Sequence, residues 1–259
     1  MRPYVLAETN WKTVRETHYQ VAILPWGATE AHNYHLPYAT DNALATHIAT
    51  EAAAFAWASG ARTVVLPTVP FGVNTGQLDV KLDLNMMPST QAALLRDLAD
   101  VVQRAGIEKM LLLNAHGGND FKQILRELGV SFPKLFFCIL NWWKVIPTDG
   151  YFREPGDHAG ALETAAMLHL HPEWVRPLDE AGPGKAQPWQ ISGLREGWVW
   201  AERPWTQVTE DTGIGNPAEA TAKQGEYFIH ATVQKVGQFL VELAQTPREA
   251  FFRPPSDVV

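Results

Sequence analysis

The sequence predicts an α/β protein with a mostly parallel central sheet that helices cover on both faces. Short apolar runs, typical of buried strands, alternate along the chain with longer segments of helical periodicity. This alternation is typical of parallel sheets, because their strands are joined by helical crossovers. The 259 residues are enough to bury the core of one large domain of this class.

Four apolar runs are the predicted strands: residues 21–25, 63–69, 110–113 and 135–140. Helices are predicted at residues 42–59, 89–105, 120–128 and 158–170, with a further one inside 217–245. Residues 71–88 have no clear period and are predicted to form a long loop, with a short hairpin as an option.

The chain has no internal repeat and no linker-like break. Residues 1–259 are therefore interpreted as a single domain. An irregular elaboration rich in Trp, Pro and Gly is expected at about 172–216, between the last two helices.

The composition argues against two classes of partner. Net charge is −7 and Lys and Arg form no cluster, so nucleic acid, which requires a basic patch, is not an expected partner. No apolar run approaches the roughly 20 residues of a membrane helix, and residues 1–11 lack the apolar core of a secretory signal. The single cysteine, Cys138, lies in an apolar run and is interpreted as a core residue. We therefore expect a soluble, cytoplasmic protein.

The first polar cluster follows the strand at 21–25 and contains Glu30, His32 and Asp41. Glu30 and His32 are two residues apart, so on an extended segment their side chains point the same way. Imidazole and carboxylate together suit zinc, manganese or iron. The alternative is a polar loop in which Asp41 merely caps the following helix.

The second cluster, residues 114–119, follows the strand at 110–113 and contains His116, Gly117 and Gly118. The two glycines allow a tight turn and close approach of the backbone to a ligand. The alternative is an ordinary glycine turn with a hydrogen-bonded histidine. Because ligand sites gather at the carboxyl ends of parallel strands, the first two clusters are expected to converge.

The third cluster contains Asp157, His158 and Glu163. On one helix His158 and Glu163 would lie about 140° apart, so they serve one site only if His158 lies at or before the helix start. The alternative makes Asp157 an N-cap and Glu163 an acid that stabilises the helix dipole.

Together these clusters resemble the creatininase (creatinine amidohydrolase) family. The resemblance rests on residues 24–32, 35–37, 40–41, 114–119, 158–164 and 212–222, which occur in the family's order.

The resemblance implies a three-layer α/β/α sandwich, a homohexamer, and two divalent metal ions per subunit, zinc or manganese with iron as a further option. By position, Glu30 and His32 would each hold one ion, Asp41 would bridge both, and His116 would complete the first. His158 matches the family histidine that acts as a proton shuttle.

The chain departs from the family pattern at Gly118. Creatininase has there, two residues after the histidine matching His116, a glutamate that ligates the second ion. We hypothesise that Glu163 takes this role, because its Ala and Leu neighbours are an unusual setting for a solvated carboxylate.

A second departure lies in the loop that follows Gly72. Many family members have a histidine and a Phe-Pro-Gly-Thr stretch in this loop, whereas residues 74–79 and 84–90 here differ. The loop is expected to border the substrate pocket, so creatinine itself is not the assumed substrate.

The activity that follows is hydrolysis of a C–N bond in a small cyclic or linear amide. A metal-activated water would attack the carbonyl or amidine carbon, and His158 would donate a proton to the leaving nitrogen. The same site would also suit a peptidase or a formamide hydrolase. A metal-binding protein without catalysis is the remaining alternative, and the presence of His158 counts against it.

Overall fold

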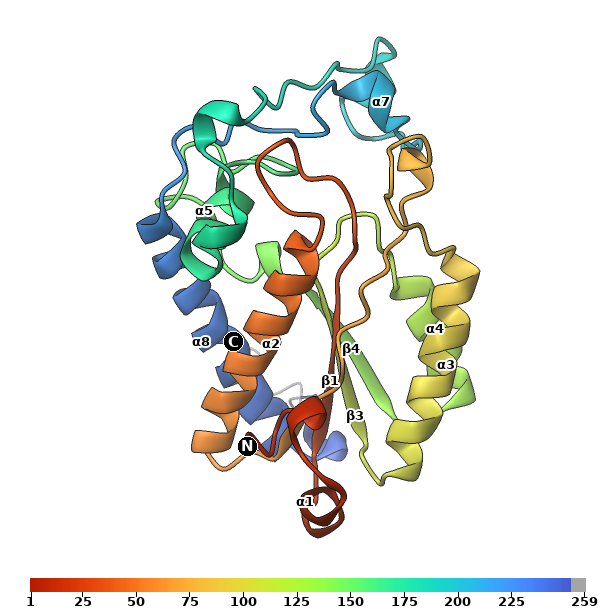
Figure 1. Cartoon of the computed structure of the whole chain (residues 1–259). Helices are drawn as coiled ribbons and strands as arrows, with labels where there is room; N and C mark the ends of the chain where they lie inside the picture. Colours follow the sequence, from red (N-terminus) through yellow and green to blue (C-terminus); the bar gives the residue numbers. More distant parts are fainter. Residues whose placement is uncertain (253–259) are drawn as a thin grey trace, which may run out of the picture.

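A four-stranded sheet forms the centre of the computed structural model, which describes residues 1–252 (Figure 1). Its strands are β1 (Val21–Trp26), β2 (Thr63–Val65), β3 (Lys109–Asn114) and β4 (Phe136–Asn141). They lie in the order β2-β1-β3-β4, and each of the three pairings is parallel. The predicted parallel sheet is confirmed.

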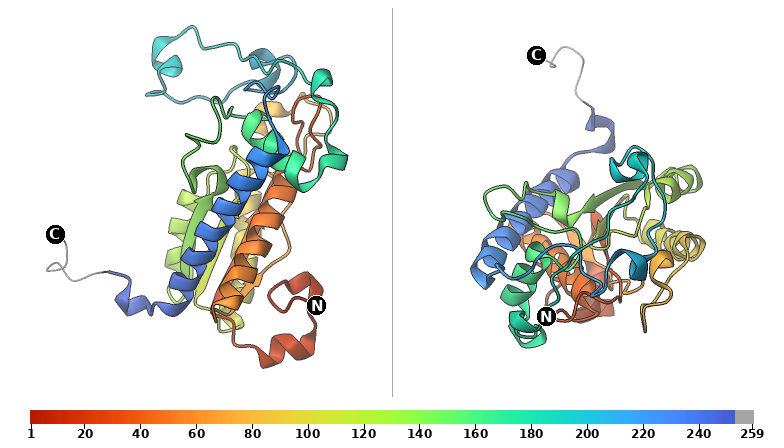
Figure 2. Two further views of the ribbon diagram at one scale, coloured as in Figure 1. Left: turned by 90° about the vertical axis from the view of Figure 1, so that its left-hand side faces the viewer. Right: turned by 90° about the horizontal axis from the view of Figure 1, so that it is seen from above.

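Helices cover both faces of the sheet, so the three-layer α/β/α arrangement is also confirmed (Figures 1 and 2). One layer contains α2 (Thr40–Ala58), α5 (Ala161–Leu170) and α8 (Ala222–Gln245). The other contains α3 (Pro88–Arg104) and α4 (Lys122–Ser131). None of the helices in residues 1–252 is long and apolar enough to cross a membrane.

Short helices complete the described chain. They are α1 (Trp11–Glu16), α6 (Ser192–Arg195) and α7 (Trp205–Val208). The 3-10 helices are η1 (Leu6–Glu8), η2 (Thr75–Gln77), η3 (Trp142–Lys144), η4 (Pro172–Trp174), η5 (Leu178–Glu180) and η6 (Arg248–Ala250).

Strand β1 shows why its sequence is continuously apolar. Val21 and Ile23 pack against the layer that contains α2, whereas Ala22, Leu24 and Trp26 pack against the layer of α3 and α4. Each large aliphatic side chain buried in this way stabilises the fold by about 1.5–3 kcal/mol. Because both faces of the strand are covered, apolar side chains are favoured at successive positions and not only at alternate ones.

Two sequence predictions in the segment after α2 are wrong in detail. The strand predicted at 63–69 ends at Val65. Leu66 still donates to the Ile23 carbonyl, but Pro25 on β1 has no backbone N–H to continue the ladder. The optional hairpin in residues 71–88 does not form; the segment contains η2 and one isolated bridge between Gly72 and Asn85.

The order of the strands places a switch point between β1 and β3. From β1 the chain crosses through α2 to β2 on one side, and then through α3 to β3 on the other. In open α/β sheets, ligands bind at such a point, outside the carboxyl ends of the strands. The irregular segment 172–216 lies over this end of the sheet (Figures 1 and 2).

Candidate metal centre

Glu30 and His32 leave the carboxyl end of β1 and are almost completely buried, with 1% and 0% exposure. Asp41 lies in the first turn of α2, but the N-cap position belongs to Ala39, so Asp41 is not the plain cap of the alternative interpretation. His32 Nε2 lies 3.1 Å from Asp41 Oδ1. The carboxylates and the imidazole of the first cluster therefore lie together as one compact group.

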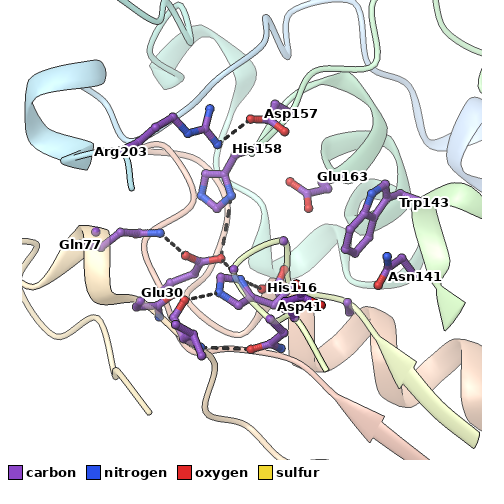
Figure 3. A pocket seen from close by; sticks show the side chains of 18 of the residues that line it. Glu30, Asp41, Gln77, His116, Asn141, Trp143, Asp157, His158, Glu163 and Arg203 are labelled. Carbon is purple, nitrogen blue, oxygen red and sulfur yellow. Dashed lines mark hydrogen bonds and ion pairs between the residues drawn. The ribbon is translucent and has the colours of Figure 1, made fainter. Parts of the chain in front are cut away.

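His116 joins this group from the carboxyl end of β3 (Figure 3). Its Nδ1 lies 2.7 Å from Glu30 Oε1 and 3.2 Å from Asp41 Oδ2. The neighbouring Asn114 fixes the turn by accepting from the His116 amide at 3.2 Å and donating to the His116 carbonyl at 2.9 Å. The predicted convergence of the first two clusters is thus present in the structure.

His158 and Glu163 complete the group from the start of α5. The helix predicted from His158 begins only at Ala161, because Ala159 adopts φ of +50°, which a right-handed helix does not allow. His158 therefore lies before the helix, as a shared site requires, and its ring centroid is 4.2 Å from that of His32. Glu163, in the first helical turn, accepts a hydrogen bond from the Ala159 amide at 2.6 Å.

Asp157 is not the N-cap that the alternative interpretation requires. The N-cap position is held by Gly160, and the Asp157 carboxylate instead forms an ion pair with Arg203 at 2.9 Å.

Each histidine of the cluster is anchored through its outer nitrogen. Because a carbonyl oxygen only accepts, His32 Nδ1 donates to the Glu30 carbonyl at 3.1 Å and His116 Nε2 donates to the Val73 carbonyl at 3.0 Å. His158 Nε2 donates in the same way to the Ala31 carbonyl at 2.8 Å. In each ring the other nitrogen is left for a ligand or a proton, which is the usual arrangement of metal-binding histidines.

The side chains form two overlapping sets whose ligand atoms lie within 4.8 Å of one another. One set is Glu30, Asp41 and His116, and the other is His32, Asp41 and Glu163. Asp41 belongs to both. Its Oδ2 is buried and lies 3.2 Å from His116 Nδ1, but it forms no hydrogen bond within residues 1–252. A buried carboxylate oxygen that forms no hydrogen bond and is shared by two carboxylate–imidazole sets fits a cation, since buried polar atoms are usually hydrogen-bonded.

A third set contains Glu30, His32 and His158, whose ligand atoms also lie within 4.8 Å of one another. His158 Nδ1 is 3.9 Å from Glu30 Oε1. The position of His158 thus suits either a ligand or a group that exchanges protons beside the centre.

The charges of the cluster shift its pKa values strongly. Burial opposes ionisation of Glu30, but His116 and the other imidazoles nevertheless hold the pKa of Glu30 below its usual range. Burial lowers and Asp41 raises the pKa of His32, with a net increase to about 10. The pKa of His116 is also well above its usual value, since Glu30 and Asp41 outweigh the effect of burial. The metal-free cluster therefore holds protons that bound cations would replace.

The cluster opens into a cavity of about 700 Å³ (Figure 3). Besides the cluster, its walls include Gln77, Trp143, Asp157 and Arg203. The loop after Gly72, which was expected to border the pocket, does so through residues 73, 74, 76 and 77.

The sequence interpretation did not single out the supports that this loop gives the cluster. Gln77 Nε2 donates to Glu30 Oε2 at 2.6 Å, and Asp83 Oδ1 accepts from the Ala31 amide at 2.7 Å. The feature of the sequence that could have indicated these two residues is the presence of polar side chains in a segment that departs from the family pattern.

Fold and cluster define a class, namely a parallel α/β protein with a buried carboxylate–imidazole centre at the carboxyl edge of its sheet. Within that class, the family model of creatinine amidohydrolase matches residues 7–240, and the chain belongs to the creatininase family.

Two curated relatives differ in their named substrates. The chain is 26% identical over 217 residues to the mycofactocin precursor peptide peptidase of Mycobacterium tuberculosis (strain ATCC 25618 / H37Rv), with 82% of this chain and 80% of that protein covered. It is 26% identical over 180 residues to the creatinine amidohydrolase of Pseudomonas putida, with 60% and 66% covered.

Solved structures share the fold. A provisionally named creatinine amidohydrolase from Bacteroides fragilis NCTC 9343 has a TM-score of 0.90 and 41% identity, with 96% of this chain and 99% of that chain covered. A manganese form of creatininase has a TM-score of 0.76 and 21% identity, with 94% and 99% covered.

Proposed function

We propose that this protein is a metal-dependent amidohydrolase that cleaves a C–N bond with the aid of two divalent ions. The observation that supports this most directly is the position of Asp41. It belongs to two of the three candidate ligand sets, and its buried Oδ2 forms no hydrogen bond within residues 1–252. Membership of the creatininase family, whose members include amide-hydrolysing enzymes, supports the same reaction class.

Glu30, Asp41 and His116 would hold the first ion, and His32, Asp41 and Glu163 the second. The donor set suits zinc and manganese, and solved creatininases are described as manganese and zinc–zinc forms. When bound, such a pair supplies a hydroxide near neutral pH and polarises the substrate oxygen. In this arrangement Glu163 takes the place of the ligand that Gly118 cannot provide.

His158 is proposed to move the proton that the leaving nitrogen requires. Its Nε2–H is held by the Ala31 carbonyl, which leaves Nδ1 free on the side of Glu30. The side chain is 10% exposed and lines the cavity, so a substrate nitrogen can reach it. An imidazole with one fixed and one free nitrogen can accept a proton from the attacking water and return it to the amine product.

The proposed substrate is a small cyclic or linear amide. A cavity of about 700 Å³ lies within the ~300–1,000 Å³ range that holds drug-sized ligands. A peptide is the second candidate, supported by the relatives named as mycofactocin precursor peptide peptidases. The identity of the residues around the cavity, not the metal centre, would choose between them.

The test is a hydrolysis assay on metal-loaded and metal-stripped protein with cyclic lactams including creatinine, formamides and short peptides. We expect metal-dependent hydrolysis of at least one of these three groups. Mass spectrometry detects it as release of an amine from a formamide or peptide, or as the gain of one water in a ring-opened lactam. Bound metal without cleavage of any of them would favour the alternative of a non-catalytic metal-binding protein.

We further propose that the protein works as a homohexamer in the cytoplasm, on the basis of the family resemblance. Light scattering coupled to size-exclusion chromatography tests the assembly, and a mass close to 28.8 kDa would contradict it.

A further inference from the structure

Gln77 lies at the end of η2 and contacts the candidate metal ligand Glu30 from outside the ligand sets (Figure 3). Its Nε2 donates to Glu30 Oε2 at 2.6 Å, and only 6% of the residue is exposed. The chain brings it there from a loop 47 positions away in sequence.

The chemistry of Glu30 fixes the orientation of the Gln77 amide. A carboxylate that binds a metal ion is deprotonated, and a deprotonated carboxylate only accepts hydrogen bonds. The amide nitrogen must therefore face Glu30. The amide oxygen, Gln77 Oε1, is then buried without a hydrogen-bond partner among residues 1–252. Within residues 1–252 the contact with Glu30 is thus the one hydrogen bond of the Gln77 side chain, and it is formed although a buried, unsatisfied oxygen destabilises a fold.

This contact separates the two oxygens of Glu30. Oε2 accepts from Gln77, whereas Oε1 lies 2.7 Å from His116 Nδ1 and thus faces the set of Glu30, Asp41 and His116. The second set, His32, Asp41 and Glu163, does not include Glu30. Of the two sets proposed to hold ions, Gln77 therefore contacts a member of the first and no member that belongs to the second.

We propose that Gln77 is a positioning residue for the ion held by Glu30, Asp41 and His116, because it fixes which oxygen of Glu30 that ion receives. The proposal rests on the two-ion centre proposed above. Partners of ligating carboxylates typically contribute 10–100-fold to metal affinity. The effect of Gln77 is confined to one of the two ions.

The experiment titrates metal-stripped protein with zinc alone, in competition with a chromophoric chelator that resolves two binding steps. Gln77→Leu removes the donor, and Gln77→Glu keeps the shape but sets a carboxylate against Glu30. Gln77→His offers a new N–H donor. Gln20→Leu is the matched control, because within residues 1–252 the Gln20 side chain bonds to the backbone of Arg62 and Ala244, away from the candidate centre.

We expect Gln77→Leu and Gln77→Glu to weaken one step by about 10–100-fold and to leave the other within about 2-fold of wild type. Gln77→His should recover part of the loss, and Gln20→Leu should match wild type. The melting temperature of the metal-free Gln77→Leu variant should stay within about 4 °C of wild type, since it also loses an unsatisfied oxygen.

Three results would overturn the proposal: both steps weakened alike, neither step changed, or a loss of metal binding that follows the loss of metal-free stability in all three variants. The wild-type titration separates this failure from that of the proposed function. Fewer than two zinc ions on the wild-type protein would contradict the two-ion centre itself. Two ions on wild type with unchanged Gln77 variants would contradict only the role of Gln77.

Discussion

A side chain at Gly118 would collide with the carbonyl oxygen of Val73: a Cβ built there lies 2.2 Å from that oxygen. The same oxygen accepts the hydrogen bond of His116 Nε2 at 3.0 Å. The loop that contains Val73 thus occupies the space in which the resemblance to creatininase predicts a glutamate side chain. The absence of a glutamate at position 118 and the altered loop are therefore parts of the same local difference from the family pattern.

Gly118→Ala should therefore be damaging and Gly117→Ala harmless. The first must displace the Val73 carbonyl, at a cost of roughly 1–3 kcal/mol, and should also weaken metal binding through His116. A Cβ on Gly117 meets no atom within 4 Å, so its variant should stay within about 0.5 kcal/mol of wild type. Denaturant unfolding measures both; equal stability of the two variants would contradict the close contact.

Glu163→Gln should reduce the bound metal from two ions to about one per chain, since an amide is a poor substitute for a carboxylate ligand. Elemental analysis after dialysis against zinc measures this. Glu173→Gln, at a carboxylate that is 62% exposed, is the control and should retain both ions. A Glu163→Gln protein with two tightly held ions would remove Glu163 from the ligand set.

His158→Ala should retain both ions and lose about 10²–10⁴-fold of turnover, the usual contribution of a general acid or base. Metal analysis and the hydrolysis assay are run on the same sample. Loss of an ion would instead assign His158 to the third set, with Glu30 and His32. Unchanged turnover would exclude it from the reaction.

The metal-free protein should lose stability as the pH rises from about 7 to about 10. The pKa of His32 is about 10 in the folded protein, above the ~6.5 of an unfolded chain. Between these pH values the folded state binds more protons than the unfolded state. The contribution of His32 to the free energy of unfolding is therefore fully present below about pH 6.5 and declines as the pH rises toward about 10. The raised pKa of His116 acts in the same direction.

Thermal unfolding across this pH range measures the decline. His32→Gln should show a smaller decline, which separates the effect from titration of other groups. Metal-loaded protein should lack the His32 contribution, because the bound imidazole has already released its proton. A metal-free stability that rises with pH in this window would contradict the proton-holding cluster.

The sequence by itself determined the layers of the fold and most of the candidate ligands. Strand and helix periodicities are local, and the apolar run at residues 21–25 already implied a strand buried on both faces. The chemical types of Glu30, His32, Asp41 and His116, placed after strands of a parallel sheet, indicated where they would converge.

Only the tertiary structure decided how the centre is completed. The start of α5 depends on the backbone conformation at Ala159, which places His158 before the helix and Glu163 on its first turn. The contacts of Val73 with His116 and of Gln77 with Glu30 join segments 43 and 47 positions apart. Such contacts depend on how the loop packs over the edge of the sheet, and no local periodicity encodes that packing.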